Sequence, residues 1–101
     1  MAKFGELINA NVPVLFNFFT NWNEETIAMD AVLRNVAAAL GDKAKVIKID
    51  IEKNQQLSEA LRIKGVPTFI IYKNGEMKWR QSGAQDDNTL IHRLQQFYSA
   101  Q

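Results

Sequence analysis

The chain has 101 residues, no cysteine and one histidine, and 12 Lys+Arg against 11 Asp+Glu leave a net charge of +1. Such a balance gives no general attraction for nucleic acid or for an anionic membrane surface. The absence of cysteine excludes a disulfide, a thiolate nucleophile and a cysteine-ligated metal, and one histidine is too few for a His/Cys zinc site. The length predicts one domain over residues 1–101. Because the chain has no cysteine and one histidine, we expect no metal and no cofactor.

The sequence also bears on where the protein works. No apolar run approaches the roughly 20 residues of a membrane-spanning helix. Residues Met1–Glu6 lack the apolar core of a signal peptide. We therefore expect a cytoplasmic protein without a membrane partner.

The first elements predicted are a short helix and a buried strand. Phe4, Leu7 and Ile8 follow the i, i+3, i+4 spacing of a helix. Residues 12–19 are apolar except for Asn17, which is typical of a strand covered on both faces. If Asn17 is buried, we expect its amide to find hydrogen-bond partners, since leaving it unpaired costs roughly 1–3 kcal/mol.

A long helix is predicted from Glu24 to Leu40. Asn23 is a suitable N-cap, and Gly41 is suited to the helix end. Glu24 and Glu25 then occupy the first turn, where carboxylates complement the helix dipole. The residues expected to hold the apolar period are Ile27, Ala31, Val32, Leu33, Val36, Ala37 and Leu40.

A second strand, a short helix and a third strand follow. Residues 45–51 alternate and are rich in β-branched side chains, as in a strand. Asn54 is suited to cap a short helix, whose apolar residues are Leu57, Ala60 and Leu61. The next strand is expected to begin at Pro67, because proline has no N–H to donate inside a sheet. The Val66-Pro67 bond is a candidate for a cis peptide, since X-Pro bonds have a cis penalty of only about 1 kcal/mol.

The Asn74-Gly75 pair predicts a tight hairpin into a strand over residues 77–81. Asp86 or Asp87 then caps a last helix, whose apolar stripe is Leu90, Ile91, Leu94, Phe97 and Tyr98. The resulting order is helix, strand, helix, strand, helix, strand, strand, helix. This order predicts a mixed sheet with helices on both faces.

Several segments, in order and at matching spacing, resemble the thioredoxin family over nearly the whole chain. They are Pro13–Phe18 leading into Trp22, Val46–Asp50, Ile63–Thr68, Phe69–Gly75 and Ser82–Ala84. The resemblance implies an α/β, thioredoxin-like three-layer sandwich with a mixed four-stranded core sheet flanked by helices. It also implies that Pro67 is the family's cis-proline.

The resemblance breaks at the family's redox motif, Trp-Cys-Gly-Pro-Cys. These positions read Trp22 to Thr26 here, so Asn23 and Thr26 stand in place of the two cysteines. Asn17 stands where members carry a buried acid. The family's chemistry needs a thiolate that attacks a disulfide, and neither an amide nor a hydroxyl replaces it. We therefore expect no disulfide oxidoreductase activity and no catalytic residue.

Without the cysteines, the resemblance still implies a docking groove for a protein or peptide partner. Its residues are Trp22, Val66, Pro67, Thr68 and Gly83. We expect a redox-inactive protein that binds its partner there. Two alternatives stay open, a thiol-independent enzyme using Glu24, Glu25 or Thr26, and a structural or assembly subunit. The identity of the partner and the oligomeric state also stay open.

Two further positions were considered as sites. Trp79 lies between Lys78 and Arg80, a pattern that is able to stack on nucleic acid, but ordinary edge-strand packing explains it better beside a net charge of +1. We therefore expect no nucleic-acid partner. His92 is expected to be a structural residue at or near the surface, because one histidine makes no site.

Overall fold

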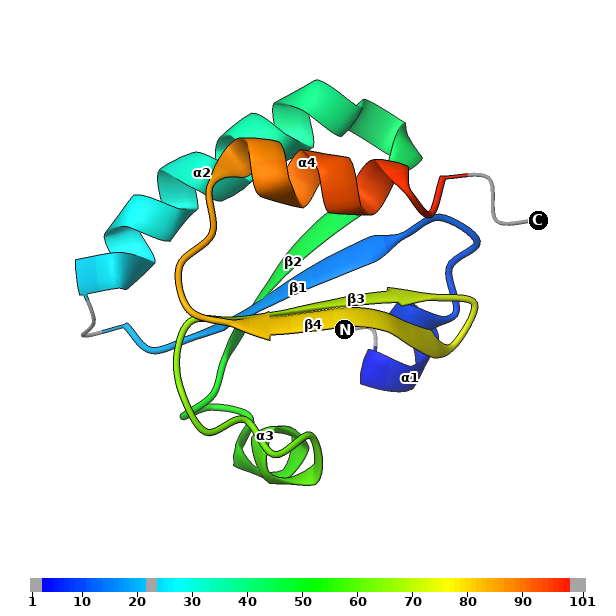
Figure 1. Ribbon diagram of the computed structural model, residues 1–101. Coiled ribbons are helices and arrows are strands. Elements are labelled where there is room, and N and C mark those ends of the chain that lie inside the picture. The colour runs from blue at the N-terminus through cyan, green and yellow to red at the C-terminus, as the bar shows by residue number, and fades with distance from the viewer. Residues whose placement is uncertain (1–2, 22–23, 99–101) are drawn as a thin grey trace.

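The computed structural model describes residues 3–21 and 24–98 (Figure 1). Its helices are α1 (Phe4–Ile8), α2 (Glu24–Leu40), α3 (Gln55–Ala60) and α4 (Asp87–Gln95), and a short 3₁₀ turn, Gly41–Lys43, follows α2. Its strands are β1 (Val14–Phe19), β2 (Lys45–Asp50), β3 (Thr68–Lys73) and β4 (Glu76–Ser82). The predicted order of elements is confirmed, although the last helix ends at Gln95 and continues toward Tyr98 only as turns.

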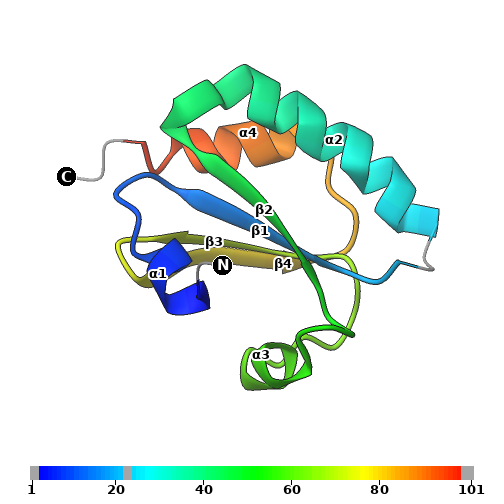
Figure 2. The ribbon, with the colours of Figure 1, turned by 180° about the vertical axis from the view of Figure 1, so that it is seen from behind.

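The strands form one four-stranded sheet in the order β2-β1-β3-β4. β1 and β2 are parallel, whereas β3 is antiparallel to both β1 and β4. Helices α2 and α4 lie on one face of the sheet, and α1 and α3 lie on the other (Figures 1 and 2). The predicted mixed sheet and three-layer α/β sandwich are confirmed. None of the described helices is long and apolar enough to cross a membrane.

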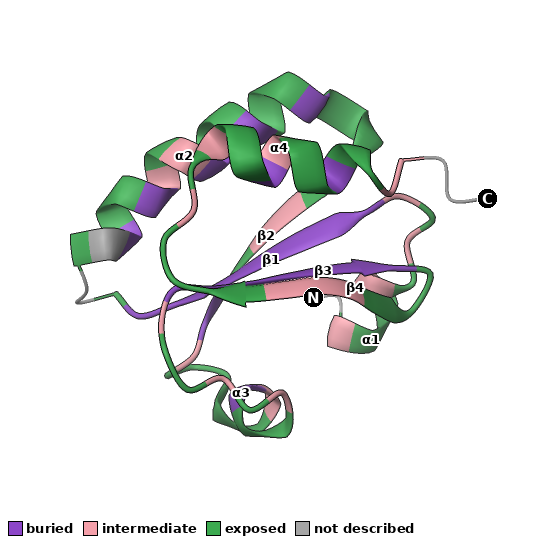
Figure 3. Cartoon of the chain, viewed as in Figure 1, coloured by how far each residue is buried: buried purple, intermediate pink, exposed green. Residues whose placement is uncertain are grey.

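β1 lies in the centre of the sheet and is buried along its whole length (Figure 3). Leu15 belongs to the core cluster under α2 and α4, whereas Val14, Phe16 and Phe18 belong to the cluster on the α1 and α3 face. This division follows the alternation of side chains along a strand. The nearly continuous apolar run therefore marks a strand covered on both faces, as predicted.

The buried stripe of α2 differs from the predicted one. Ile27 was placed in that stripe, but its side chain is 75% exposed, and Ala31 and Ala37 are exposed too. The buried apolar positions are Met29, Leu33, Val36 and Leu40. The first turn of α2 projects beyond the end of the sheet, so an apolar side chain there has no strand to pack against (Figure 1).

The hairpin between β3 and β4 has the predicted turn. Asn74 and Gly75 both have positive φ, 52° and 82°, as a type I′ turn requires. The turn is tied to the end of α1, because the N–H of Asn74 donates to Ala10 O and that of Gly75 to Ile8 O, at 3.0 and 2.8 Å. A Cβ at Gly75 would lie 2.8 Å from Asn9 Oδ1. Both the backbone conformation and this close approach favour glycine.

Of the predicted helix N-caps, Asn23 lies outside the described residues, and the other two have different outcomes. Asp86 is the N-cap of α4, and its Oδ1 accepts from the N–H of Thr89 at 2.8 Å. Hydrogen bonds from the side chain and backbone of Thr89 hold the pKa of Asp86 below its usual value. Asn54 precedes α3 as expected, but its amide donates to Asp50 O at 2.9 Å and does not cap the helix.

Candidate functional site

The topology brings one end of three strands together with the start of α2. Thr68, the first residue of β3, pairs with Phe18 near the end of β1 and with Ser82 at the end of β4. Helix α2 begins shortly after β1, and its first turn lies at this same end of the molecule (Figure 1). We name the described residues gathered here the cis-proline edge: Thr20, Thr26, Val66, Pro67, Thr68 and Gly83. The predicted residues Trp22 and Asn23, and the side chain of Glu25, lie outside what the structure describes.

The peptide bond between Val66 and Pro67 is cis. Pro67 is buried, whereas Val66 is partly exposed. Among the described residues, the backbone N–H and C=O of Val66 make no hydrogen bond. Val66 therefore offers one donor and one acceptor at this edge.

The residues around Pro67 hold one another in place. The Thr68 hydroxyl donates to Gly65 O at 2.5 Å and lies 3.2 Å from Ser82 Oγ. The N–H of Gly83 donates to Pro67 O at 2.8 Å. Gly83 has φ +98°, a conformation that glycine adopts without strain. The Pro67 carbonyl is thus already bonded within the chain.

Thr26, which stands at the second cysteine position of the family motif, anchors the first turn of α2. Its side chain is buried, and its hydroxyl donates to the carbonyl oxygen of Thr20 at 2.5 Å. No basic group among the described residues is hydrogen-bonded to this hydroxyl. A threonine nucleophile needs such a base. The geometry of Thr26 is therefore that of a structural link between β1 and α2.

In and directly after β1 lie buried polar side chains that have no hydrogen-bond partner in the described part of the chain. Asn17 has no exposed surface, and neither its Oδ1 nor its Nδ2 has a hydrogen-bond partner among the described residues. The Oγ1 of Thr20 is in the same situation. Asn17 is therefore buried, and the expectation that a buried Asn17 amide would find hydrogen-bond partners is wrong in the described part of the chain.

Two features of this end of the molecule were missed by the sequence reasoning. Ile27 lies on the first turn of α2, next to Thr26, as a large exposed apolar side chain. Asn21 Nδ2 donates to Asp50 Oδ2 at 2.8 Å and so connects the segment after β1 to the end of β2. The available signal for the second feature was a polar residue at or just past the end of each of two parallel strands, because such ends lie side by side.

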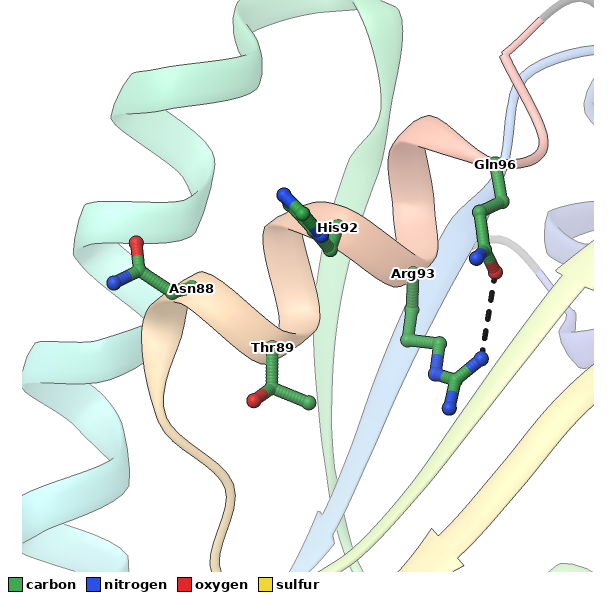
Figure 4. A pocket seen from close by; sticks show the side chains of 5 residues that line it. All are labelled: Asn88, Thr89, His92, Arg93 and Gln96. Atoms are coloured by element: carbon green, nitrogen blue, oxygen red, sulfur yellow. Dashed lines mark hydrogen bonds between the residues drawn. The ribbon is translucent and has the colours of Figure 1, made fainter.

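His92 lies on the outer surface of α4, exposed as expected. It lines a shallow pocket of about 390 Å³ with Asn88, Thr89, Arg93 and Gln96 (Figure 4). The interaction drawn there joins Arg93 Nη1 to Gln96 Oε1 at 3.5 Å. The described residues include no group of three or more His, Asp or Glu side chains placed to hold a metal ion.

Trp79 and its cationic neighbours are engaged within the chain. The Trp79 ring is partly buried against the core cluster under α2 and α4. Lys78 Nζ lies 2.8 Å from Glu76 Oε1, and Arg80 Nη1 donates to Leu61 O at 2.5 Å. These contacts support the interpretation of this segment as ordinary edge-strand packing.

The sequence of the chain matches known proteins along most of its length. The sequence model of the Thioredoxin family matches residues 1–96. Chloroplastic thioredoxin Y of Oryza sativa subsp. japonica is 38% identical over 95 residues, covering 93% of this chain and 56% of that protein. The thioredoxin of Rickettsia bellii is 29% identical over 86 residues, covering 85% and 82%. The chain thus spans little more than half the length of the plant relative.

The fold matches solved structures equally well. A mutant thioredoxin from Halobacterium salinarum superposes with a TM-score of 0.84 at 27% identity, over 94% of this chain and 82% of that one. Chloroplastic thioredoxin z superposes with a TM-score of 0.81 at 26% identity, over 90% and 82%. With the family model covering residues 1–96 and a sheet of matching architecture, this cysteine-free chain belongs to the thioredoxin family.

Proposed function

We propose that this chain is a redox-inactive member of the thioredoxin family that binds a protein or peptide partner at the cis-proline edge. One observation carries the proposal. The backbone N–H and C=O of Val66 are unpaired among the described residues, in a chain whose sequence has Asn23 and Thr26 at the positions of the family's two cysteines. These two features together support docking of an extended chain without sulfur chemistry.

The loss of redox chemistry follows from the side chains themselves. Thiol–disulfide exchange needs a thiolate that attacks a disulfide sulfur and a second thiol that releases the mixed disulfide. The chain has no cysteine. The Thr26 hydroxyl is buried and donates to Thr20 O, so it is neither free nor placed to act in the thiolate's stead.

The proposed docking mode is the addition of a short strand. An extended segment that pairs with the N–H and C=O of Val66 forms main-chain hydrogen bonds independent of its sequence. Specificity then comes from neighbouring side chains. Ile27 supplies exposed apolar surface. Trp22, which the family resemblance assigns to this groove, lies outside the described residues and is expected to add an indole.

Charge favours a basic partner segment. Glu24 is exposed in the first turn of α2, and Glu25 follows it in sequence. Both residues precede Thr26 directly in sequence, and we expect their carboxylates to attract Lys or Arg side chains of the partner. Because Glu24 is exposed, this attraction is expected to weaken as salt is added. We propose the cytoplasm as the location of this chain, whereas the plant relatives are named as chloroplastic thioredoxins.

We expect no disulfide reductase activity from this protein, because the attacking sulfur does not exist. The measurement is the rate at which a protein disulfide is reduced by dithiothreitol with and without the chain. The expected rate equals that of dithiothreitol alone at every protein concentration. A rate that rises in proportion to the concentration of this protein would overturn the redox-inactive assignment.

The docking surface is tested by replacing Ile27 with serine. Peptides selected from a random library on the immobilised protein serve as probes, and their affinity is measured by calorimetry. Ile27→Ser and Trp22→Ala are each expected to weaken binding about tenfold, as the loss of a central apolar contact of roughly 1.4 kcal/mol does. Amide chemical shifts are expected to move at Val66, Thr68 and Gly83.

Met77→Ser is the matched control for Ile27→Ser. Met77 is the other exposed large apolar residue in the described part of the chain, 44% exposed, and it lies near the hairpin at the opposite end of β4. This variant is expected to bind the same peptides with unchanged affinity. If both serine variants bind normally, or if the shifts map to Phe97 and Tyr98, the edge is not the docking site and a role as an assembly subunit takes its place.

A further inference from the structure

β2 is an edge strand with backbone groups that point away from the sheet. On its inner side, the N–H of Lys45 donates to Pro13 O and that of Ile51 to Phe19 O, each at 3.0 Å. These donors lie six residues apart, and consecutive residues of a strand direct their backbone groups to opposite sides. The odd-numbered residues of β2 therefore bond to β1, and the even-numbered ones face outward.

Two of the outward residues are free to pair. The N–H and C=O of Val46 and Lys48 have no partner among the described residues. The third, Asp50, already accepts a hydrogen bond on its carbonyl from Asn54 Nδ2 at 2.9 Å. The free edge thus carries two donors and two acceptors, enough for one short added strand.

A hollow lies on each face of the sheet beside this edge. On the α2 face it has a volume of about 350 Å³ and is lined by Asp30, Leu33, Arg34, Ala37, Val46 and Lys48. On the opposite face it has about 310 Å³, and its apolar lining is Phe4, Leu7, Ile47, Ile49 and Leu57. Figure 2 shows β2 at this edge, between α2 on one side and α1 and α3 on the other. Because side chains of a strand alternate between faces, neighbouring residues of an added strand would enter the two hollows.

The charges around the β2 edge favour an acidic segment over a second copy of this chain. Lys45 and Arg34 are exposed and make no ion pair among the described residues, whereas Lys48 pairs with Asp30 at 2.5 Å. Two copies of β2 placed edge to edge would bring Lys45 and Lys48 of both chains together, and like charges on an edge oppose such pairing. An acidic segment instead meets the unpaired cations Lys45 and Arg34 with opposite charge.

The other edge strand is less suited to take up a strand. The pairing of β4 with β3 is irregular between Ile71 and Tyr72, and such irregularities twist an edge away from a partner. β2 pairs with β1 in unbroken register over all of its residues.

We propose that the β2 edge binds an extended acidic peptide segment as an added strand, through Val46 and Lys48, at a surface distinct from the cis-proline edge.

The probe for this proposal is the peptide acetyl-Asp-Glu-Ile-Val-Ile-Asp-Glu-amide, titrated into the labelled full chain. The amide signals of Val46 and Lys48 are expected to shift, and their hydrogen exchange is expected to slow. Raising the salt concentration is expected to weaken binding. The same peptide with lysine at every acidic position is expected to give no saturable shift.

Charge-reversal variants separate this edge from the rest of the surface. Lys45→Glu is expected to weaken binding of the acidic peptide by at least about threefold, since it exchanges an attraction for a repulsion. Lys78→Glu is the matched control on β4, with the same change in net charge, and is expected to leave the affinity unchanged. Shifts at Val66, Thr68 and Gly83 in place of β2, or equal weakening by both variants, would overturn the proposal. So would slowed exchange at Val46 and Lys48 without peptide together with a dimer in sedimentation, because a second copy would then occupy the edge.

Discussion

Replacing Lys73 with methionine is expected to lower the free energy of unfolding by about 2–3 kcal/mol, the effect of removing hydrogen bonds made by a buried charged group. Lys73 ends β3 and is only 3% exposed. Its Nζ donates to the carbonyl oxygens of Phe97 and Tyr98, at 2.6 and 3.1 Å. Methionine keeps the apolar stem but leaves both carbonyls without this donor. Urea unfolding followed by circular dichroism measures the change.

The location of the Lys73 ammonium predicts that Lys73→Met loosens the turns after α4 as well as lowering the stability of the whole protein. The two carbonyls belong to the turns that follow α4, where the helix dipole is negative and a cation is favoured. Loss of the cation should loosen this end, so the amides of Phe97 and Tyr98 are expected to exchange faster in Lys73→Met. Lys78→Met is the control, because its ion pair with Glu76 is exposed and should not measurably affect stability. Equal urea midpoints for the two variants would show that Lys73 does not stabilise the turns after α4.

The elements predicted correctly are those that local chemistry specifies. The Asn74-Gly75 turn follows from two residues that accept positive φ, and β1 follows from an apolar run too long to be half-exposed. The meeting of Val66, Thr68 and Gly83 at one edge follows from the order of the strands once a mixed sheet is assumed. Sequence reasoning reached these features because each depends on neighbours in the chain or on a topological rule.

The features that sequence did not reveal depend on distant packing. From sequence, a lysine beside a hairpin is expected to be exposed to solvent. Lys73 is buried because the residues after α4 pack over it, and this packing cannot be predicted from its neighbours in the chain. Ile27 fits the helical period, but the period cannot tell where the helix projects past the sheet. The free edge of β2 is likewise a property of what lies beside a strand and not of the strand's own residues.

Replacing Asn17 with valine is expected to raise the free energy of unfolding by about 1–3 kcal/mol, the usual cost of leaving a buried polar group unpaired. Asn17 has no exposed surface, and its amide has no hydrogen-bond partner among the described residues. Its neighbours across the sheet are Lys48 and Phe69. Valine is apolar, similar in size and favoured in strands, so it removes the desolvation cost without opening a cavity. A higher urea midpoint with an unchanged slope is the expected measurement.

Asn17→Asp is the informative counterpart, because it keeps the shape and adds a titratable group. Burial disfavours the charged form, and Lys48 across the sheet is already paired with Asp30, so the folded-state pKa of this carboxyl should be raised above its unfolded value of about 3.9. Its destabilisation relative to the parent protein should therefore be small at pH 3 and grow as the pH rises above the unfolded pKa, until the folded pKa is reached. A valine variant less stable than the parent, or an aspartate variant whose deficit does not change between pH 3 and 7, would mean that polar partners surround Asn17 after all.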